Sequence, residues 1–293
     1  PVRRGTVPDR VAGMRAALAL WRSTHPGPTL VVTALSLGLG IAAGLDAWRV
    51  VVLVIAVFFG QLSIGLSNDA IDADRDRSVG RTDKPIARGD VSVRAAWVAA
   101  IGSLIVALAL TGWLGLAALA AHAVLLASAW AYNAGLKSTA VSIVPFLVSF
   151  GLFPSVATLS DPHPELAAWW ATLAGAILGA SVHLTNVLPD LDDDRETGVR
   201  GLPHRIGARW SAVLAAIGIV VGAAAVIWGS AAGYVPRVGA LSWVCAAVVV
   251  CAAVATIVLA VNRAPGRILF RLVMFAALVL ALQLALSGGG LTS

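Results

Sequence analysis

Residues 50–68 read VVVLVIAVFFGQLSIGLSN, a run of nineteen residues without a charged side chain. A helix needs about 20 consecutive apolar residues to cross the hydrocarbon core of a bilayer, which is about 30 Å thick. Because no water is available there, the backbone groups must be hydrogen-bonded to one another within the segment, and a helix achieves this. The stretch therefore predicts a transmembrane helix, and with it a membrane protein.

Similar runs recur along the chain and predict an all-α, polytopic membrane bundle of about nine transmembrane helices. The predicted spans are 28–45, 50–68, 93–112, 114–132, 141–159, 166–186, 210–230, 238–261 and 268–287. We expect residues 28–293 to form one intramembrane domain. The basic segment 1–27 is predicted to be a helix on the membrane surface, with a plain basic flank as the alternative.

The amino-acid composition excludes several other classes of protein. Apolar residues make up 59% of the 293 residues and charged residues 12%, against roughly 45–50% and about 25% in soluble domains. The mean hydropathy is +0.88. A soluble domain, a disordered chain and a disulfide scaffold are therefore excluded.

The basic residues are divided unequally between the two membrane faces that nine spans imply. Nineteen of the 21 Lys and Arg residues fall on the face that holds the N-terminus, and only Arg49 and Arg237 fall on the other. Basic loops stay in the cytoplasm, so we expect an integral multi-pass protein of the plasma membrane with a cytoplasmic N-terminus. The net charge of +6 follows from this topology and does not indicate a nucleic-acid partner.

The ends of the second and sixth predicted spans share a motif. Residues 68–80 read NDAIDADRDRSVG, and residues 186–198 read NVLPDLDDDRETG. At an offset of 118 residues both fit N-x3-D-x3-D-R-x2-G, in a chain with only four asparagines. Four spans separate the copies, so both emerge on the cytoplasmic face, as expected for a parallel repeat related by an axis along the membrane normal.

Each copy of the motif predicts a ladder of oxygen ligands, because Asn, Asp and Asp at i, i+4 and i+8 lie on one side of a helix. Carboxylates this close repel one another and need a cation between them. Oxygen ligands without a His or Cys cluster favour Mg²⁺, which usually binds one or two carboxylates together with substrate phosphates. Two facing ladders therefore predict a Mg²⁺ site that holds a diphosphate. The alternative is an acidic, solvated loop balanced by arginines.

Basic residues near the two ladders fit such an anion. The stretch RTDKPIARG (residues 81–89) follows the first ladder, and GLPHR (residues 201–205) follows the second. Lys137, in YNAGLK (residues 132–137), is the only cation between the fourth and fifth predicted spans. We expect several of these residues to bind phosphate oxygens, although each taken alone is also explained by topology.

Three polar residues lie inside predicted spans and are candidates for substrate contact. His183 precedes Asn186 by three residues, Gln61 precedes Asn68 by seven, and His122 lies in the fourth span. Polar residues within a membrane are functional candidates by default. The alternative for each is an ordinary hydrogen bond between helices.

At these motifs the sequence resembles the UbiA-type family of intramembrane prenyltransferases, which carries NDxxDxxxD after its second helix and DxxxD after its sixth. Residues 68–76 and 190–194 match the two motifs. The stretch RTDKPIARG is similar to the family's RTxxRPxxxG, with Lys84 where arginine is commoner, and YNAGLK is similar to YSxxLK. Nine helices are also the family's pattern, so the resemblance covers nearly the whole chain.

The resemblance implies transfer of an isoprenyl group from a prenyl diphosphate to an aromatic, quinone-precursor or lipid-like acceptor, through an allylic carbocation and with two Mg²⁺ ions. The implied metal ligands are Asn68, Asp69, Asp72, Asp76, Asp190 and Asp194, with Asp69 in a supporting role. The expected catalytic residues are Asp72, Asp190 and Lys137. With the buried polar residues included, the expected substrate contacts are Arg22, Arg81, Lys84, Lys137, Tyr132, His183 and Gln61.

Two other functions stay open. A terpene cyclase on the same scaffold would ionise the same donor and capture the cation with the donor's own double bonds. A transporter or lipid-binding protein would fit a parallel repeat, but the polar ladders lie at one membrane face and not at the midplane.

Overall fold

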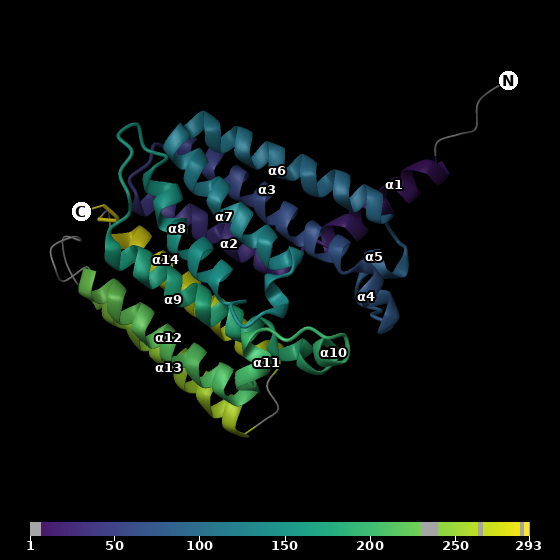
Figure 1. The fold of residues 1–293 in the computed structure, drawn as a ribbon. Helices are drawn as coiled ribbons and strands as arrows, with labels where there is room; N and C mark the ends of the chain where they lie inside the picture. The colour runs from purple at the N-terminus through teal and green to yellow at the C-terminus, as the bar shows by residue number, and fades with distance from the viewer. Residues whose placement is uncertain (1–6, 230–239, 263–265, 288–289, 293) are drawn as a thin grey trace.

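The computed structural model describes residues 7–229, 240–262, 266–287 and 290–292. Arg237 and the first six residues of the predicted surface segment lie outside these ranges. The described elements are α1 (Val7–Arg22), α2 (Pro26–Ala42), α3 (Ala47–Ile71), α4 (Ala73–Ser78), α5 (Pro85–Arg88), α6 (Val93–Leu114), α7 (Leu116–Ala134), η1 (Leu136–Ser138), α8 (Val144–Thr158), α9 (Trp169–Asn186), η2 (Leu188–Asp190), α10 (Leu191–Glu196), α11 (Leu202–Ile206), α12 (Ala208–Gly229), α13 (Ala240–Asn262) and α14 (Arg267–Ser287) (Figure 1).

The helices confirm the predicted all-α membrane bundle, because each of the nine predicted spans overlaps a helix of at least 15 residues. Within the described ranges, α3, α6, α7, α9, α12 and α13 are long and apolar enough to cross a membrane. Helices α1 and α2, bent by 70° at their junction, form a seventh such span if they are taken together. Helix α8, with 15 residues, is shorter than a typical span.

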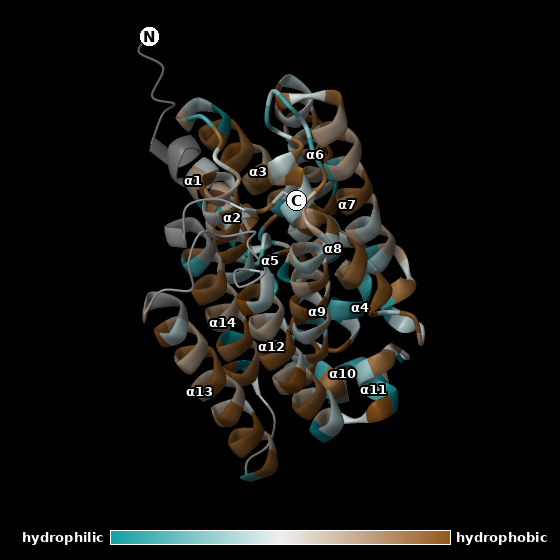
Figure 2. Cartoon of the chain, turned by 90° about the vertical axis from the view of Figure 1, so that its left-hand side faces the viewer, coloured by the Kyte–Doolittle hydropathy of each residue, from teal (hydrophilic) through white to brown (hydrophobic). Residues whose placement is uncertain are grey.

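The long helices are largely brown, and thus hydrophobic, in Figure 2, and many of their large apolar side chains are exposed. Val98 and Ile105 of α6, Leu214 of α12 and Val254 of α13 are all exposed. Such surfaces would aggregate in water, and they are suited to contact with lipid chains.

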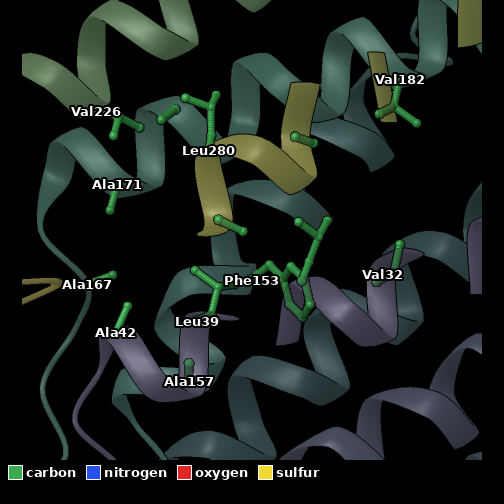
Figure 3. Packing of buried hydrophobic residues seen from close by; sticks show 14 of the residues in the cluster. Val32, Leu39, Ala42, Phe153, Ala157, Ala167, Ala171, Val182, Val226 and Leu280 are labelled. Carbon is green, nitrogen blue, oxygen red and sulfur yellow. The ribbon is translucent and has the colours of Figure 1, made fainter. Parts of the chain in front are cut away.

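The interior of the bundle is packed by residues from helices far apart in the sequence. Leu39 of α2, Phe153 of α8 and Leu280 of α14 are buried in one hydrophobic cluster (Figure 3). Helices α8 and α9 approach each other closely because glycines face α8. A Cβ atom added at Gly175 would lie 2.3 Å from the carbonyl oxygen of Phe150. This contact is with the backbone, so it could not be relieved by a side-chain rotation.

The 118-residue repeat extends beyond the residues on which it was predicted. Helices α4 and α10 are each six residues long and begin 118 residues apart. Gly80 and Gly198 follow them with φ angles of 69° and 81°. Gly89 and Gly207, again 118 residues apart, follow α5 and α11 with φ angles of 83° and 84°. Positive φ favours glycine, so the repeat is also one of backbone conformation.

Neither copy of the motif forms the continuous helical ladder that we predicted. Helix α3 ends one residue before Asp72, although the Asp72 amide still donates to the Asn68 carbonyl (3.0 Å). In the second copy α9 ends at Asn186, and η2, which contains Pro189, precedes α10. Proline lacks an N–H and interrupts a helix, and the crowded carboxylates of both copies disfavour a straight helix.

The two copies of the motif lie at the same end of the bundle. Helices α4, α5, α10 and α11 all lie there, whereas the C-terminus lies toward the other end (Figure 1). The short helices α4, α10 and α11 carry the hydrophilic colour in Figure 2. The fold therefore places two acidic segments, 118 residues apart in sequence, side by side.

Candidate functional site

Asp72 is a buried carboxylate of this end and is bound by two cations. Its residue is 6% exposed. One carboxylate oxygen accepts a hydrogen bond from Lys137 Nζ at 2.5 Å, and the other accepts from Arg75 Nη2 at 2.9 Å. Lys137 reaches this position because η1 follows directly on α7. Burial lowers the pKa of Lys137 below its usual range even though the Asp72 carboxylate opposes the shift.

The Arg75 guanidinium lies between carboxylates of both motifs. It is 3.7 Å from Asp76 and 4.0 Å from Asp194, in addition to its contact with Asp72. Burial raises the pKa of Asp76 above its usual range. Three carboxylates from two halves of the chain thus gather around one positive charge.

The second motif is joined to the loop after the first. Arg81 donates to the Asp190 carboxylate at 3.3 Å and to Asp83 at 2.8 Å. The hydrogen bond with Asp83 raises the pKa of Arg81, and the same bond lowers the pKa of Asp83. Asp194 is 3.2 Å from His204 Nε2. Asp190 and Asp194 therefore each have a cationic or histidine partner.

Asp69 forms a separate polar group with Lys84 and His25. The carboxylate is 2% exposed and accepts from Lys84 Nζ at 2.5 Å, while His25 Nε2 lies 2.9 Å away. His25 lies at the break between α1 and α2, with a left-handed φ of 55°. The break approaches α3 closely, because a Cβ at Gly65 would lie 2.5 Å from the Thr24 carbonyl oxygen. Glycine at position 65 thus allows His25 to reach Asp69.

A cavity of about 200 Å³ adjoins this charged end and extends into the bundle. Asn68 and Asn186, the first residues of the two motifs, both line it, as do Tyr132 and Gln61. The other lining residues are mostly apolar or aromatic, among them Val57, Leu125, Phe146, Phe150 and Phe153. The site is therefore a largely hydrophobic cavity with a charged mouth, which is formed by the motif carboxylates and the cations paired with them.

Two predicted substrate contacts are placed elsewhere. His183 is fully buried, bonds to Ser142 Oγ at 3.0 Å and packs against Phe146 and Tyr132, so it does not line the cavity. His183 therefore packs against Phe146 and Tyr132, two aromatic residues of the cavity wall, without lining the cavity itself. Arg22, at the end of α1, is exposed and makes no hydrogen bond or ion pair with another described residue.

The structure also brings in residues that were not among the expected metal ligands and substrate contacts. Arg75, His25 and His204 each contact a motif carboxylate. Arg75 was visible within the first motif, but the repeat gave no reason to select it, since position 193 of the second copy is Asp193. His25 is separated from Asp69 by 44 residues, and only the bend before α2 brings the two together.

The predicted metal ligands are arranged around cationic side chains. Among the residues that the structure describes, no group of three or more Asp, Glu, His or Cys side chains is arranged to hold a metal ion. Asp72, Asp76 and Asp194 instead surround the Arg75 guanidinium. Their role as metal ligands stays a prediction.

Comparisons with known proteins agree on one family. The model of the UbiA prenyltransferase family matches residues 28–284. The chain is 30% identical over 222 residues to the digeranylgeranylglyceryl phosphate synthase of Natronomonas pharaonis, a match that covers 73% of this chain and 76% of the relative.

Solved structures have a similar fold. A UbiA homologue from Aeropyrum pernix has a TM-score of 0.71 at 20% identity, covering 85% of this chain and 94% of that one. A UbiA homologue from Archaeoglobus fulgidus bound to GPP and Mg²⁺ has a TM-score of 0.68 at 17% identity, covering 91% and 99%. With the family match over most of its length, the chain belongs to the UbiA prenyltransferase family and is a prenyltransferase of the membrane.

Proposed function

We propose that the protein transfers an isoprenyl group from a prenyl diphosphate to an aromatic, quinone-precursor or lipid-like acceptor within the membrane. The observation that supports this best is that carboxylates from both motifs gather at the mouth of an apolar cavity. Four cations pair with them there: Arg75, Arg81, Lys84 and Lys137. A diphosphate fits the mouth and an isoprenoid chain fits the cavity. The A. fulgidus homologue, whose fold is similar, is bound to GPP and Mg²⁺.

The residues of the mouth fit Mg²⁺ by their chemistry. They offer carboxylate and amide oxygens, which Mg²⁺ prefers, and their carboxylates already surround a positive charge in the form of Arg75. We propose two ions, held directly or through water by Asn68, Asp72, Asp76, Asp190 and Asp194. Bound Mg²⁺ would neutralise the negative charge that develops on the departing diphosphate.

The basic residues of the mouth can pair with a carboxylate when no donor is bound and with the diphosphate when it is. Without a donor, Lys137 and Arg81 pair with Asp72 and Asp190, which keeps the buried carboxylates compensated. With donor and metal bound, we propose that Arg81, Lys84 and Lys137 turn to the diphosphate oxygens. Burial of Lys137 makes its charge costly without an anion close by.

The cavity supplies the conditions for the carbon chemistry. Loss of diphosphate leaves an allylic carbocation, which water would quench, and the apolar lining excludes water. Tyr132, Phe146 and Phe150 offer aromatic faces along the wall, and such faces stabilise a nearby cation. The acceptor's nucleophilic carbon or oxygen then forms the new bond to the cation and loses a proton.

Replacement of Lys84 by methionine is expected to raise the KM for the prenyl diphosphate by about tenfold or more, the usual effect of losing one hydrogen bond to a charged group. The substitution also leaves buried Asp69 with His25 as its only described partner. The measurement is steady-state kinetics with the donor varied. The matched control is Arg88→Gln, at the other end of α5, since Arg88 pairs with Asp90 on the surface. An unchanged KM for the Lys84 variant would remove this residue from the diphosphate site.

We also propose that the protein lies in the plasma membrane with its N-terminus and its active-site loops on the cytoplasmic side. The expected result is that a cysteine at exposed Ser78 reacts with a membrane-impermeant maleimide in inverted vesicles, whereas a cysteine at exposed Glu165 reacts only after permeabilisation. Both would be introduced with Cys245 and Cys251 changed to alanine. The opposite labelling pattern would reverse the proposed orientation.

Mass spectrometry of the products from one prenyl diphosphate, with and without a panel of phenolic and lipid acceptors, tests the function itself. A prenylated acceptor supports transfer. A terpene hydrocarbon or alcohol formed without any acceptor would instead support the cyclase. Binding of the donor with no release of diphosphate would favour a transporter or lipid-binding protein.

A further inference from the structure

His122 is a polar residue in the interior of the membrane bundle that the proposed chemistry does not use. It lies on α7, is 2% exposed, and lines the cavity. Its Nδ1 is 2.7 Å from the hydroxyl of Thr111 on α6. A polar side chain buried at this depth is costly unless it has a function or a partner for each polar atom.

The protonation of the ring follows from the Thr111 contact. The Thr111 hydroxyl has one hydrogen, and it is donated to the Ala107 carbonyl at 2.8 Å, in the same helix. We therefore assign the hydroxyl oxygen as the acceptor of the bond from His122, which places the proton on Nδ1. A charged ring among apolar side chains would be costly, so the ring is neutral and Nε2 is a bare acceptor. No described residue donates a hydrogen bond to that nitrogen.

Helix α3 leaves this nitrogen accessible at Gly60. A Cβ added at Gly60 would lie 3.2 Å from His122 Nε2 and 3.1 Å from Leu126 Cδ2. The next residue, Gln61, also lines the cavity and makes no hydrogen bond with another described residue. One hydrogen-bond acceptor beside Gly60 and one amide on the next residue, neither bonded to another described residue, therefore both line the cavity.

The depth of this pair separates it from the diphosphate mouth. Gln61 precedes Asn68 by seven residues on α3, and His122 precedes Tyr132 by ten on α7. At 1.5 Å of rise per residue these separations are about 10 Å and about 15 Å along the helices. An unsubstituted isoprenoid chain has no group that could bond to either side chain. The polar pair is therefore suited to the second substrate.

We propose that Gln61 and His122 form a hydroxyl-binding subsite that recognises an O–H group of the acceptor, about 10 Å from the atom that receives the isoprenyl group. This rests on the proposed transfer function. The bare Nε2 requires a donor, so an alcohol or phenol satisfies it and a ketone, ester or methyl ether does not. The acceptor is thus an elongated molecule with a nucleophilic end at the mouth and a free hydroxyl further along.

A pair of synthetic acceptors tests the subsite. The first is a phenol whose alkyl chain ends in a hydroxyl about 10 Å from the ring oxygen, and the second is its terminal methyl ether. Both compete in one reaction with a prenyl diphosphate and Mg²⁺, and mass spectrometry gives the ratio of their kcat/KM values. We expect the wild-type protein to prefer the free hydroxyl by about five- to tenfold, the usual effect of one hydrogen bond.

The His122→Leu variant should reduce that preference to about one while still prenylating the ether. Thr111 keeps its bond to Ala107 in this variant, so no buried donor is orphaned. Gly60→Ala should weaken the preference in the same direction, because the new methyl group crowds Nε2. Gly102→Ala is the matched control, since a Cβ there meets nothing within 4 Å. An equal rate for both acceptors in the wild type, or a preference that survives His122→Leu, would overturn the subsite.

A second readout does not depend on turnover. The thermal unfolding midpoint is measured in nanodiscs with a long-chain primary alcohol and with its methyl ether. The alcohol should stabilise the wild-type protein more than the ether does, and His122→Leu should abolish the difference. If no acceptor is prenylated but this difference is observed, the transfer function fails and the subsite stands. If the alcohol and the ether act alike, the subsite fails whatever the products are.

Discussion

Replacement of Asp72 by asparagine is expected to lower the rate of isoprenyl transfer by about a hundredfold or more, the usual loss when one preorganised electrostatic group is removed from an active site. Asparagine keeps the shape of the side chain and removes its charge. Lys137 and Arg75 then lose the carboxylate that both contact at 2.5 and 2.9 Å. Asp190→Asn should act similarly from the second motif. Diphosphate release and product formation are the measurements.

The matched control for this prediction lies in the same motif. Asp74 is two residues from Asp72, but its side chain is 96% exposed and pairs only with Arg77 among the described residues. Asp74→Asn should therefore keep nearly the full rate. If Asp72→Asn and Asp190→Asn turned over as fast as Asp74→Asn, the motif carboxylates would not be the reactive centre.

Substitution of Gly175 by alanine is expected to destabilise the bundle by roughly 2–3 kcal/mol, the upper part of the range for overpacking a core. The new Cβ would lie 2.3 Å from the backbone oxygen of Phe150, so α8 and α9 would have to separate. Alanine is intrinsically better than glycine in a helix by about 1 kcal/mol, which is too little to offset the clash. Because Phe150 lines the cavity, the separation should also lower activity.

Thermal unfolding in detergent, compared with Gly102→Ala, checks this prediction. Gly102 is also in a long helix, but it faces open space, so alanine there should be neutral or stabilising. A Gly175→Ala protein with the wild-type unfolding midpoint would show that α8 and α9 are not packed as closely as the structure has them.

The sequence was sufficient for those features that rest on local composition. Runs of apolar residues predicted a helix at each of the nine spans, since a helix is required wherever a segment of that length lies in lipid. The 118-residue repeat predicted two acidic motifs on the same membrane face, and in the structure Arg75 lies within 4.0 Å of Asp72 from the first motif and Asp194 from the second. The same offset also relates Gly89 to Gly207, whose positive φ angles became visible only in the backbone.

Features that depend on where a helix bends or faces were not predictable in this way. The spacing of Asn68, Asp72 and Asp76 predicted a continuous helical ladder, but the helix is interrupted at Asp72. His183 has the spacing of a cavity residue, yet it is rotated behind Tyr132. Periodicity gives the face of an isolated helix, while the face that meets a cavity is decided by the neighbours packed around it.

Equilibrium binding of a prenyl diphosphate, with Mg²⁺ and then with excess EDTA, tests the central claim most directly. We expect tight binding in Mg²⁺, a loss of about a hundredfold or more in EDTA, and a similar loss in Mg²⁺ for both Asp72→Asn and Asp190→Asn. Binding that is equally tight in EDTA, or that depends on only one of the two motifs, would contradict a diphosphate held by metal between the two halves of the chain.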